Sequence, residues 1–369
     1  MVKCKKHSEE VSPALKLYLP HNLFPLCAIF AIVFVLMLSR AAFTDNSFGA
    51  YPAPQVMYDE IYALEKNYPA NAKVIEYGKS VQGRPLLAVK ISLDLAKDKP
   101  AAVLAANIHG NEWIGNRMAM AAAHRLLEGR ESDPWIASML AKMDFYVLPC
   151  INPDGYFKTQ ETLADPSIPT RNARKNAHKV DLNRNFPLPG ERTMTIGMAG
   201  SDDPDHERYQ GPAPYSEPET AAVRDFFAAH RNIFAAVDFH CNWATIFPPK
   251  CNSSECDRNF KKMCAAGIAK QTISKYACVA QRHVDTFTGE MEDALYYDFG
   301  AMAVCMEISP VSLGTEQKKR LGHVFWEMNP EDIGAWVGND RDAALAMLDA
   351  AFDITGGKPL PADKLKVEK

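Results

Sequence analysis

Two kinds of apolar pattern alternate along the chain between about residues 51 and 352. Short uncharged apolar runs such as 101–106 are typical of buried strands, whereas runs such as 113–127, in which apolar residues recur every three or four positions, predict helices. This alternation is typical of an α/β domain with a largely parallel sheet. Strands are predicted at 73–77, 85–92, 101–107, 144–149, 234–240 and 302–308, and helices at 55–66, 112–128, 217–229, 259–274 and about 340–352.

The predicted elements form one unit, because no repeat, linker or low-complexity tract interrupts them. We predict a single α/β domain over residues 46–355, built on a mixed, mostly parallel twisted sheet that is flanked by helices. The segment 158–215, rich in Pro, Asp and Arg, is predicted to be a loop around a site. The tail 356–369, which begins with two glycines, is predicted to be disordered.

Residues 1–45 differ in kind from the rest of the chain. Lysines precede the uncharged apolar run 23–38, a pattern typical of a signal peptide or a signal anchor. The run is shorter than the roughly 20 residues that span a bilayer, which favours a signal peptide, whereas the long positive start and Arg40 beside the small residues favour an anchor. A buried core helix is disfavoured by the terminal position. Because the Lys-rich end stays cytoplasmic, we expect the domain to be exported to the periplasmic or extracellular face.

His109 and Glu112 stand where a predicted strand gives way to a predicted helix. In open α/β sheets this edge is where ligands bind. Zinc is bound by imidazole nitrogens and carboxylate oxygens, and catalytic zinc sites use three protein ligands and leave one position for water. The spacing alone is weak evidence, because a chain with 10 histidines contains such pairs by chance. A third ligand is therefore needed.

His240 is the best third ligand, because it too ends a predicted strand, whereas the other histidines lie in a helical pattern, in polar loops or without an acidic partner. A water at a metal also needs a carboxylate that is not itself a ligand to accept its proton. Glu307 is the candidate for this base, since a lone acid in the apolar strand 302–308 is costly unless it is paired or functional. A structural ion pair with an arginine is the alternative explanation for Glu307.

Positive side chains gather in the segment 174–187. Arginine is suited to bidentate capture of a carboxylate and to stabilising an oxyanion. Taken alone, such a segment is usually a solvated surface loop, and a nucleic-acid patch is the next interpretation. The whole chain has 41 Lys+Arg against 45 Asp+Glu, so no basic excess indicates a polyanionic partner, and we expect no nucleic-acid binding.

Several separate segments, taken in order, resemble the zinc carboxypeptidases of the carboxypeptidase A type. The resemblance covers about residues 50 to 350, and the combination of segments is far more specific than any single motif. The close spacing of 174–177 and 180–183 is more similar to bacterial murein peptide amidases than to digestive carboxypeptidases. The segments are Gly78–Arg84, His109–Trp113, Asn152–Tyr156, Val180–Phe186, Tyr209–Pro212, Ser216–Thr220, His240 and Glu307.

The resemblance implies a metal centre with one Zn²⁺ per chain. His109, Glu112 and His240 would hold the zinc, and Glu307 would be the general base. Asp181 would accept the other ring N–H of the first histidine ligand, which fixes the tautomer as metal sites generally require.

The resemblance also implies the contacts to the substrate. Arg174 would polarise the scissile carbonyl and stabilise the oxyanion, and Asn183 and Arg184 would bind the terminal carboxylate of the substrate. Digestive members carry an Arg between the ligands of the first pair, where this chain has Asn111, so one contact to that carboxylate is absent.

Two further comparisons with the family concern the substrate side chain and a proton donor. The family has a mobile Tyr upstream of the base, but its spacing leads to Asp285, and the tyrosines at 296–297 are interpreted as core aromatics. Three acids, Glu290, Glu292 and Asp293, fall where the family lines its side-chain pocket. Glu292 is the predicted substrate contact, and an acidic pocket would favour Lys, Arg or diaminopimelate, although a solvated acidic loop is an equal alternative.

The function implied is an exported zinc-dependent metallocarboxypeptidase that hydrolyses the C-terminal amide bond of peptides through a zinc-bound water and a Glu base. A first alternative is a murein peptide amidase that cleaves the γ-D-glutamyl-diaminopimelate bond. An alternative of another class is a catalytically inactive, membrane-anchored binding protein, against which the retained ligands and base argue. An amidohydrolase of small acylated amino acids is a further alternative. We expect a monomer.

Export would permit disulfides. Four cysteines cluster in one region and predict one or two bridges of undetermined pairing: Cys251, Cys256, Cys264 and Cys278. Three others lie in or beside predicted strands and are expected to be buried thiols: Cys150, Cys241 and Cys305.

Overall fold

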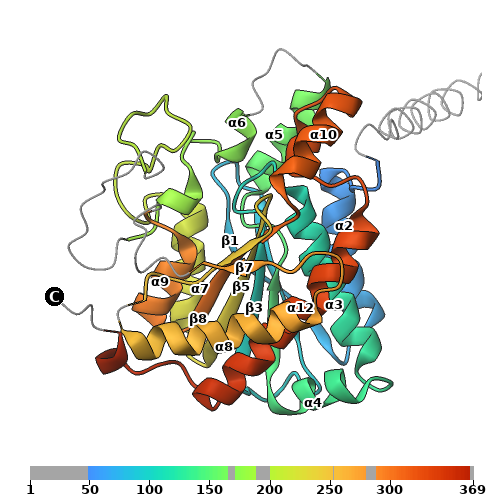
Figure 1. Cartoon of the computed structure of the whole chain (residues 1–369), viewed down its shortest axis with the longest axis vertical. Helices are drawn as coiled ribbons and strands as arrows, with labels where there is room; N and C mark the ends of the chain where they lie inside the picture. Colours follow the sequence, from blue (N-terminus) through green and yellow to red (C-terminus); the bar gives the residue numbers. More distant parts are fainter. Residues whose placement is uncertain (1–48, 165–170, 188–199, 252, 280–287, 366–369) are drawn as a thin grey trace, which may run out of the picture. The chain divides into compact units, whose positions relative to one another are not determined.

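A mixed sheet of eight strands, in the order β1-β2-β4-β3-β5-β8-β6-β7, forms the centre of the domain (Figure 1). It is seen in a computed structural model that describes residues 49–164, 171–187, 200–251, 253–279 and 288–365. The strands are β1 (Ala72–Lys79), β2 (Pro85–Ile91), β3 (Ala101–Ala106), β4 (Asp144–Leu148), β5 (Ile233–Cys241), β6 (Thr245–Phe247), β7 (Ala277–Cys278) and β8 (Met302–Ile308).

The centre of the sheet is parallel and its margins are mixed. β3 pairs in parallel with β4 and with β5, and β5 pairs in parallel with β8. β1, β2 and β4 pair antiparallel, β6 pairs antiparallel with β8, and β7 pairs in parallel with β6. The four strands β4, β3, β5 and β8 therefore all end at one edge of the sheet.

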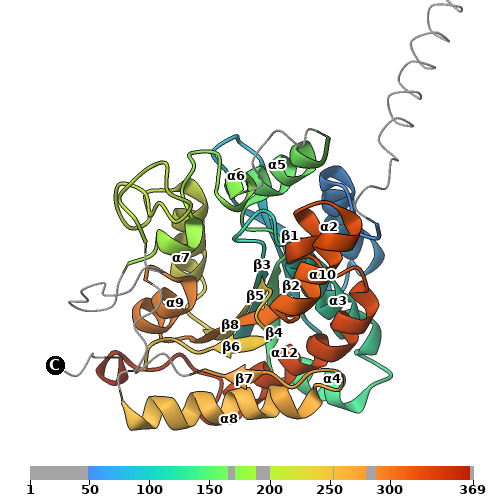
Figure 2. The same cartoon turned by 45° about the horizontal axis from the view of Figure 1, so that its top comes forward.

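Helices cover both faces of this sheet (Figures 1 and 2). α2, α3, α8 and α12 pack on one face in one apolar cluster, and α7 and α9 pack on the other face in a second cluster. The helices are α2 (Pro54–Asn67), α3 (Trp113–Gly129), α4 (Pro134–Lys142), α5 (Pro153–Ala164), α6 (Arg171–Arg174), α7 (Pro218–Ala229), α8 (Ser254–Lys270), α9 (Met291–Phe299), α10 (Val311–Leu321), α11 (Phe325–Met328) and α12 (Ile333–Thr355), with 3-10 turns at η1 (Leu182–Arg184) and η3 (Ala362–Lys364).

Strand β3 shows why the central strands are uncharged. Ala102 and Leu104 belong to the apolar cluster under α3 and α12, whereas Val103 and Ala105 belong to the cluster under α7 and α9. Successive side chains of a strand point to opposite faces, so a strand covered on both faces needs apolar residues at every position. The continuous apolar pattern thus reflects burial on two sides.

The sequence located six of the eight strands, and the predicted α/β domain with a mixed, mostly parallel sheet is confirmed. The two strands that were not predicted, β6 and β7, have three residues and two residues, which is too short for a period to show. The helices predicted at 259–274 and 340–352 begin earlier, at Ser254 and Ile333. Helices α4, α5, α9, α10 and α11 were not predicted.

Two predictions about irregular segments need correction. The predicted loop 158–215 contains the end of α5, the short helix α6 and the turn η1. The tail predicted to be disordered over 356–369 is ordered as far as Leu365, because the Leu360 N–H donates to the Gly300 carbonyl at 2.8 Å and η3 follows. Residues 366–369 lie outside the described residues.

The apolar run 23–38, predicted to be a signal peptide or anchor, also lies outside the described residues. Among the residues that the structure describes, no helix combines the length and apolar character that crossing a membrane requires.

Cysteines of the predicted cluster divide into one bridge and two thiols. Cys251 and Cys256 form a disulfide. Cys264 and Cys278 are thiols in the structure. The three cysteines in or beside strands are buried free thiols, as predicted.

Asp340 of α12 is a buried carboxyl that joins three segments behind the sheet. Its Oδ2 accepts a hydrogen bond from the Tyr276 hydroxyl at 2.6 Å, and its Oδ1 accepts from Gln271 Nε2 and Asn339 Nδ2, each at 2.8 Å. The Tyr276 hydroxyl in turn accepts the Ser309 N–H at 3.0 Å. Burial raises the pKa of Asp340 to about 6, against three hydrogen bonds that lower it.

We predict that Asp340 makes the fold less stable as pH rises from about 4 to 7. Because its pKa is about 6 when folded and 3.8 ordinarily, the folded chain binds more protons than the unfolded chain in this interval. The difference of about two units corresponds to about 3 kcal/mol. In urea unfolding, the free energy of unfolding of the parent minus that of Asp340→Asn should fall by about this amount between pH 4 and pH 7. A difference that does not change with pH would contradict the raised pKa of Asp340.

Candidate metal centre and active site

Three potential metal ligands meet at the carboxyl ends of the central parallel strands. His109 lies in the turn between β3 and α3, Glu112 is the N-cap residue of α3, and His240 is the penultimate residue of β5. Because β3 and β5 are hydrogen-bonded neighbours in parallel, their ends bring the two histidines to the same place.

The turn that carries His109 packs closely on two other segments. A Cβ added to Gly110 would lie 2.3 Å from the Gly155 Cα, so no side chain fits there. The Gly110 N–H donates to the Arg174 carbonyl at 3.1 Å, and Asn152 Nδ2 donates to the carbonyls of Ile108 and Arg174 at 3.2 and 3.3 Å. This packing explains the Asn152–Tyr156 motif, because it holds Arg174 next to His109.

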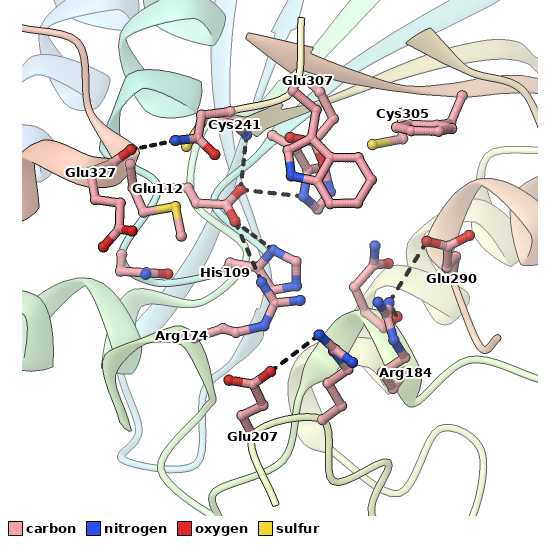
Figure 3. A pocket seen from close by; sticks show the side chains of 18 of the residues that line it. His109, Glu112, Arg174, Arg184, Glu207, Cys241, Glu290, Cys305, Glu307 and Glu327 are labelled. Carbon is pink, nitrogen blue, oxygen red and sulfur yellow. Dashed lines mark hydrogen bonds and ion pairs between the residues drawn. The ribbon is translucent and has the colours of Figure 1, made fainter. Parts of the chain in front are cut away.

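The ligand atoms of His109, Glu112 and His240 face one another. Figure 3 shows His109 and Glu112 of this set. The two Glu112 oxygens lie 2.8 Å from His109 Nδ1 and 3.3 Å from His240 Nδ1. One ligand atom from each residue lies within 4.8 Å of the other two, and all three residues are buried. The predicted set is therefore brought together, and it could hold a metal ion.

A buried carboxylate lies behind each histidine. Asp181 Oδ1 is 3.2 Å from His109 Nε2, which agrees with the expectation for Asp181. Asp238 Oδ2 is 2.8 Å from His240 Nε2, and Asp238 was not predicted. The signal was present in the sequence, because Asp238 and His240 are two positions apart on a strand and so point to the same face. With Nε2 held by an acid, each ring presents Nδ1 to the ligand cluster.

Glu307 stands beside the cluster on β8. Its register partner on β5 is His240, and its Oε2 has no hydrogen-bond partner among the described residues. Burial raises the pKa of Glu307 to about 8, with the negative Glu112 adding to the rise and His240 and Arg174 opposing it. The carboxyl lines a cavity of about 450 Å³ together with the three candidate ligands. The predicted base is thus placed next to the predicted metal site.

The residues of the segment 174–187 that are predicted to contact substrate line the same cavity, and Figure 3 shows the two arginines among them. Arg174 Nη1 is 3.7 Å from a Glu112 oxygen, while its Nη2 and Nε contact Asp181 Oδ2 at 3.0 and 3.1 Å. Asn183 Oδ1 accepts the Met291 N–H at 2.9 Å. Arg184 Nη1 lies 3.7 Å from Glu290 Oε1. The structure therefore brings all three predicted substrate-binding residues of this segment to the candidate site.

Glu292 is placed differently from the expectation. It is 1% exposed, and the cavity wall at this point is formed by Glu290 and Cys305. Neither carboxylate oxygen of Glu292 has a hydrogen-bond partner among the described residues. Burial, followed by the nearby acids Glu290 and Asp293, raises the pKa of Glu292 well above its ordinary value. Glu292 thus lies behind the wall, in an acidic environment.

Several residues that line the cavity were not predicted. They come from the loop before α7, the turn after β5, strand β6, and α10, α11 and the turn between them. No signal in the sequence indicates them, because they have neither a motif nor a periodic position. They are Glu207, Arg208, Asn242, Trp243, Phe247, Lys318, Val324, Glu327 and Met328.

The position expected for the mobile Tyr, near Asp285, lies outside the described residues. The two nearby tyrosines are packed away from the site, as expected. Tyr296 is 2% exposed, and its ring centroid lies 5.5 Å from that of Phe260. The Tyr297 hydroxyl donates a hydrogen bond to the Lys250 carbonyl.

The sequence profile described as zinc carboxypeptidase matches residues 57–321, which is well over half of the chain. The chain belongs to the zinc carboxypeptidase family. The predicted relationship to the carboxypeptidase A type is also confirmed by curated relatives, among them carboxypeptidase A4 of Mus musculus, which is 32% identical over 197 residues that make up 53% of this chain and 46% of the relative. The chain spans about half the length of the first curated carboxypeptidases that it matches.

Solved structures show the same zinc carboxypeptidase fold. Thrombin-activatable fibrinolysis inhibitor superposes with a TM-score of 0.67 at 22% identity, covering 82% of this chain and 74% of that chain. Carboxypeptidase A from Helicoverpa armigera superposes with a TM-score of 0.66 at 22% identity, covering 91% of this chain and 82% of that chain.

The donor set of this zinc carboxypeptidase chain fits zinc. Two imidazole nitrogens and one carboxylate are the ligand types of a catalytic zinc site with an open position. The buried acids behind both rings, Asp181 and Asp238, are the partners that zinc-ligating histidines require. The burial of several acids at one point also favours a cation there.

We predict that Asp238→Asn weakens zinc binding by about 10- to 100-fold, because the amide cannot hold the His240 ring as a carboxylate does. Chelator competition on the purified chain measures this affinity. Asp144→Asn is a matched control, since Asp144 is a buried strand acid at the opposite end of the sheet that contacts Lys90 and Lys99. Equal zinc affinity in the parent and Asp238→Asn would contradict the role of Asp238.

Proposed function

We propose that the chain is an exported zinc-dependent metallocarboxypeptidase that hydrolyses the C-terminal amide bond of peptides. One observation carries the proposal: the three candidate ligands, His109, Glu112 and His240, share one cavity with Arg184 and Glu307. The Glu307 Oε2 has no hydrogen-bond partner among the described residues. Family membership supports the chemistry. Export is supported by the lysine-rich start and the apolar run 23–38.

His109, Glu112 and His240 would hold the metal. When bound, zinc supplies Lewis acidity that polarises a carbonyl and lowers the pKa of water. Ionised beside a bound cation, Glu307 would accept the proton of the attacking water at its Oε2 and deliver it to the leaving amine. Because Glu307 performs both transfers, the lack of a Tyr near Asp285 removes no necessary step.

The two arginines would bind different negative charges of the reacting substrate: Arg174 the oxyanion and Arg184 the terminal carboxylate. Arg174 is held beside Glu112 by its two contacts to Asp181, so its guanidinium is preorganised to stabilise an oxyanion that develops near the ligand cluster. Arg184 and Asn183 lie on the cavity wall and would bind the terminal carboxylate of the peptide. A terminal carboxylate held there would place the last peptide bond, and no internal one, next to Glu307.

The acids beside the cavity favour a cationic side chain at the end of the peptide. Glu290 lines the wall, and Glu292 and Asp293 lie behind it and are buried. The Glu292 carboxyl lies among like charges and has no hydrogen-bond partner in the part of the chain that the structure describes, so an approaching cation would stabilise its ionised form. Lys, Arg and the amino group of diaminopimelate meet this requirement, so the same acids also support a murein peptide amidase as the second candidate.

We predict that Glu307→Gln lowers kcat by at least about 10²-fold while zinc remains bound, because the amide cannot accept the proton and is not a ligand. Metal analysis and hydrolysis of peptides that end in Lys measure the two effects on the same sample. Glu316→Gln, on the exposed side of α10, is the control that keeps its activity. Full activity of Glu307→Gln would remove the proposed base, and a chain that binds no zinc would favour an inactive binding protein.

We also predict that Glu290→Gln shifts the preference for peptides ending in Lys over peptides ending in Phe by about tenfold toward Phe, because it removes one negative charge from the cavity wall. The ratio of the two kcat/KM values measures this preference, and a murein tripeptide ending in diaminopimelate distinguishes the second candidate. An unchanged ratio in Glu290→Gln would show that Glu290 does not select the side chain.

A further inference from the structure

Two cysteines outside the candidate active site face each other across the boundary between α8 and β7. The Cys264 and Cys278 thiols share a hydrogen bond, and the two elements are in contact (Figure 2). Cys264 is fully buried, whereas Cys278 is partly exposed. Both side chains pack in the same apolar cluster. The pair is therefore two thiols within reach of each other, of which one is open to solvent.

The pKa values of the two thiols are shifted in opposite directions, as a reactive pair of thiols requires. The Cys264 thiol donates the hydrogen bond, which lowers the pKa of Cys278, and the neighbouring Lys261 acts in the same direction. The same bond, together with burial, raises the pKa of Cys264. A thiolate is the nucleophile in disulfide exchange, so the partly exposed Cys278 is suited to attack and the buried Cys264 to resolve.

We propose that Cys264 and Cys278 are a dithiol site that an external disulfide oxidises to an intramolecular bridge, which fixes the edge strand β7 to α8. The Cys278 thiolate attacks one sulfur of the external disulfide, such as that of oxidised glutathione or an oxidoreductase, and releases one thiolate. Cys264 then loses its proton and attacks Cys278 Sγ, which releases the second thiolate. Two cysteine thiols are oxidised and one external disulfide is reduced to two thiols.

Strand β7 is the element that such a bridge would secure. It consists of two residues at the edge of the sheet and pairs only with β6, through Thr245 and Ile246, in the part of the chain that the structure describes. β6 carries Phe247, which lines the cavity, and pairs with β8, which carries Glu307. The observed Cys251–Cys256 disulfide closes a loop between residues five positions apart. The proposed bridge would instead join a helix to the sheet.

Peptide mapping of the full chain tests the bridge directly and does not depend on the proposed peptidase activity. The chain is equilibrated with oxidised glutathione, its remaining thiols are alkylated under denaturing conditions, and it is digested with trypsin. Cleavage after Lys and Arg gives separate peptides for the two cysteines, 263–270 and 276–282, while 251–258 contains the other bridge. The expected product is a cross-linked species of 263–270 and 276–282. Recovery of both peptides alkylated would overturn the proposal.

A thermal comparison tests the consequence for stability. The loop between the two cysteines has about 15 residues, so Cys278→Ser should lower the melting temperature of the oxidised chain by roughly 5 °C. With a reductant present, which opens the other disulfide in both proteins, the difference should vanish. A difference of equal size under both conditions would mean that Cys278 contributes packing and no bridge, which would contradict the proposal.

Discussion

Buried negative charge at the carboxyl ends of the central strands is the constraint on which the site depends. Glu112 faces the Nδ1 atoms of both histidines, while Asp181 and Asp238 occupy the opposite ring nitrogens. Ionised carboxylates are costly to bury unless positive charge compensates them. Arg174 contributes part of that charge through its contacts to Asp181 and Glu112. A divalent cation between the three inner donors would supply the rest, so the polar interior of this sheet edge is consistent with a metal centre.

The sequence predicts the elements whose burial leaves a strong pattern. β3, β5 and β8 are covered on both faces, so their continuous apolar runs identified them within one or two residues. β6 and β7 were not predicted, because a strand of two or three residues shows no period. Their formation depends on pairing, of β6 with β8 and of β7 with β6. Helices α9 and α11 were not predicted because they have nine and four residues, which is too few for a helical period to show clearly. Helix α10, with 11 residues, was not predicted either.

The residues of the site likewise divide into those that the sequence predicts and those that depend on the three-dimensional structure. His109, Glu112 and His240 could be predicted, because strand ends in a parallel sheet meet at one edge. The spacing of Asp238 to His240 could have predicted its position. To predict its contact, one must also know which ring nitrogen of His240 faces the metal site. The position of Glu292 behind the wall depends on how the first turn of α9 is oriented, which no local pattern encodes.

Cleavage of a matched pair of peptides tests the central claim most directly. The two peptides share a sequence that ends in Lys, and one has a free terminal carboxylate while the other ends in an amide. Mass spectrometry of the products of the zinc-loaded chain should show stepwise loss of single residues from the first peptide and none from the second, because Arg184 and Asn183 are proposed to bind the carboxylate. Internal cleavage, equal cleavage of both peptides or no cleavage of either would contradict the account.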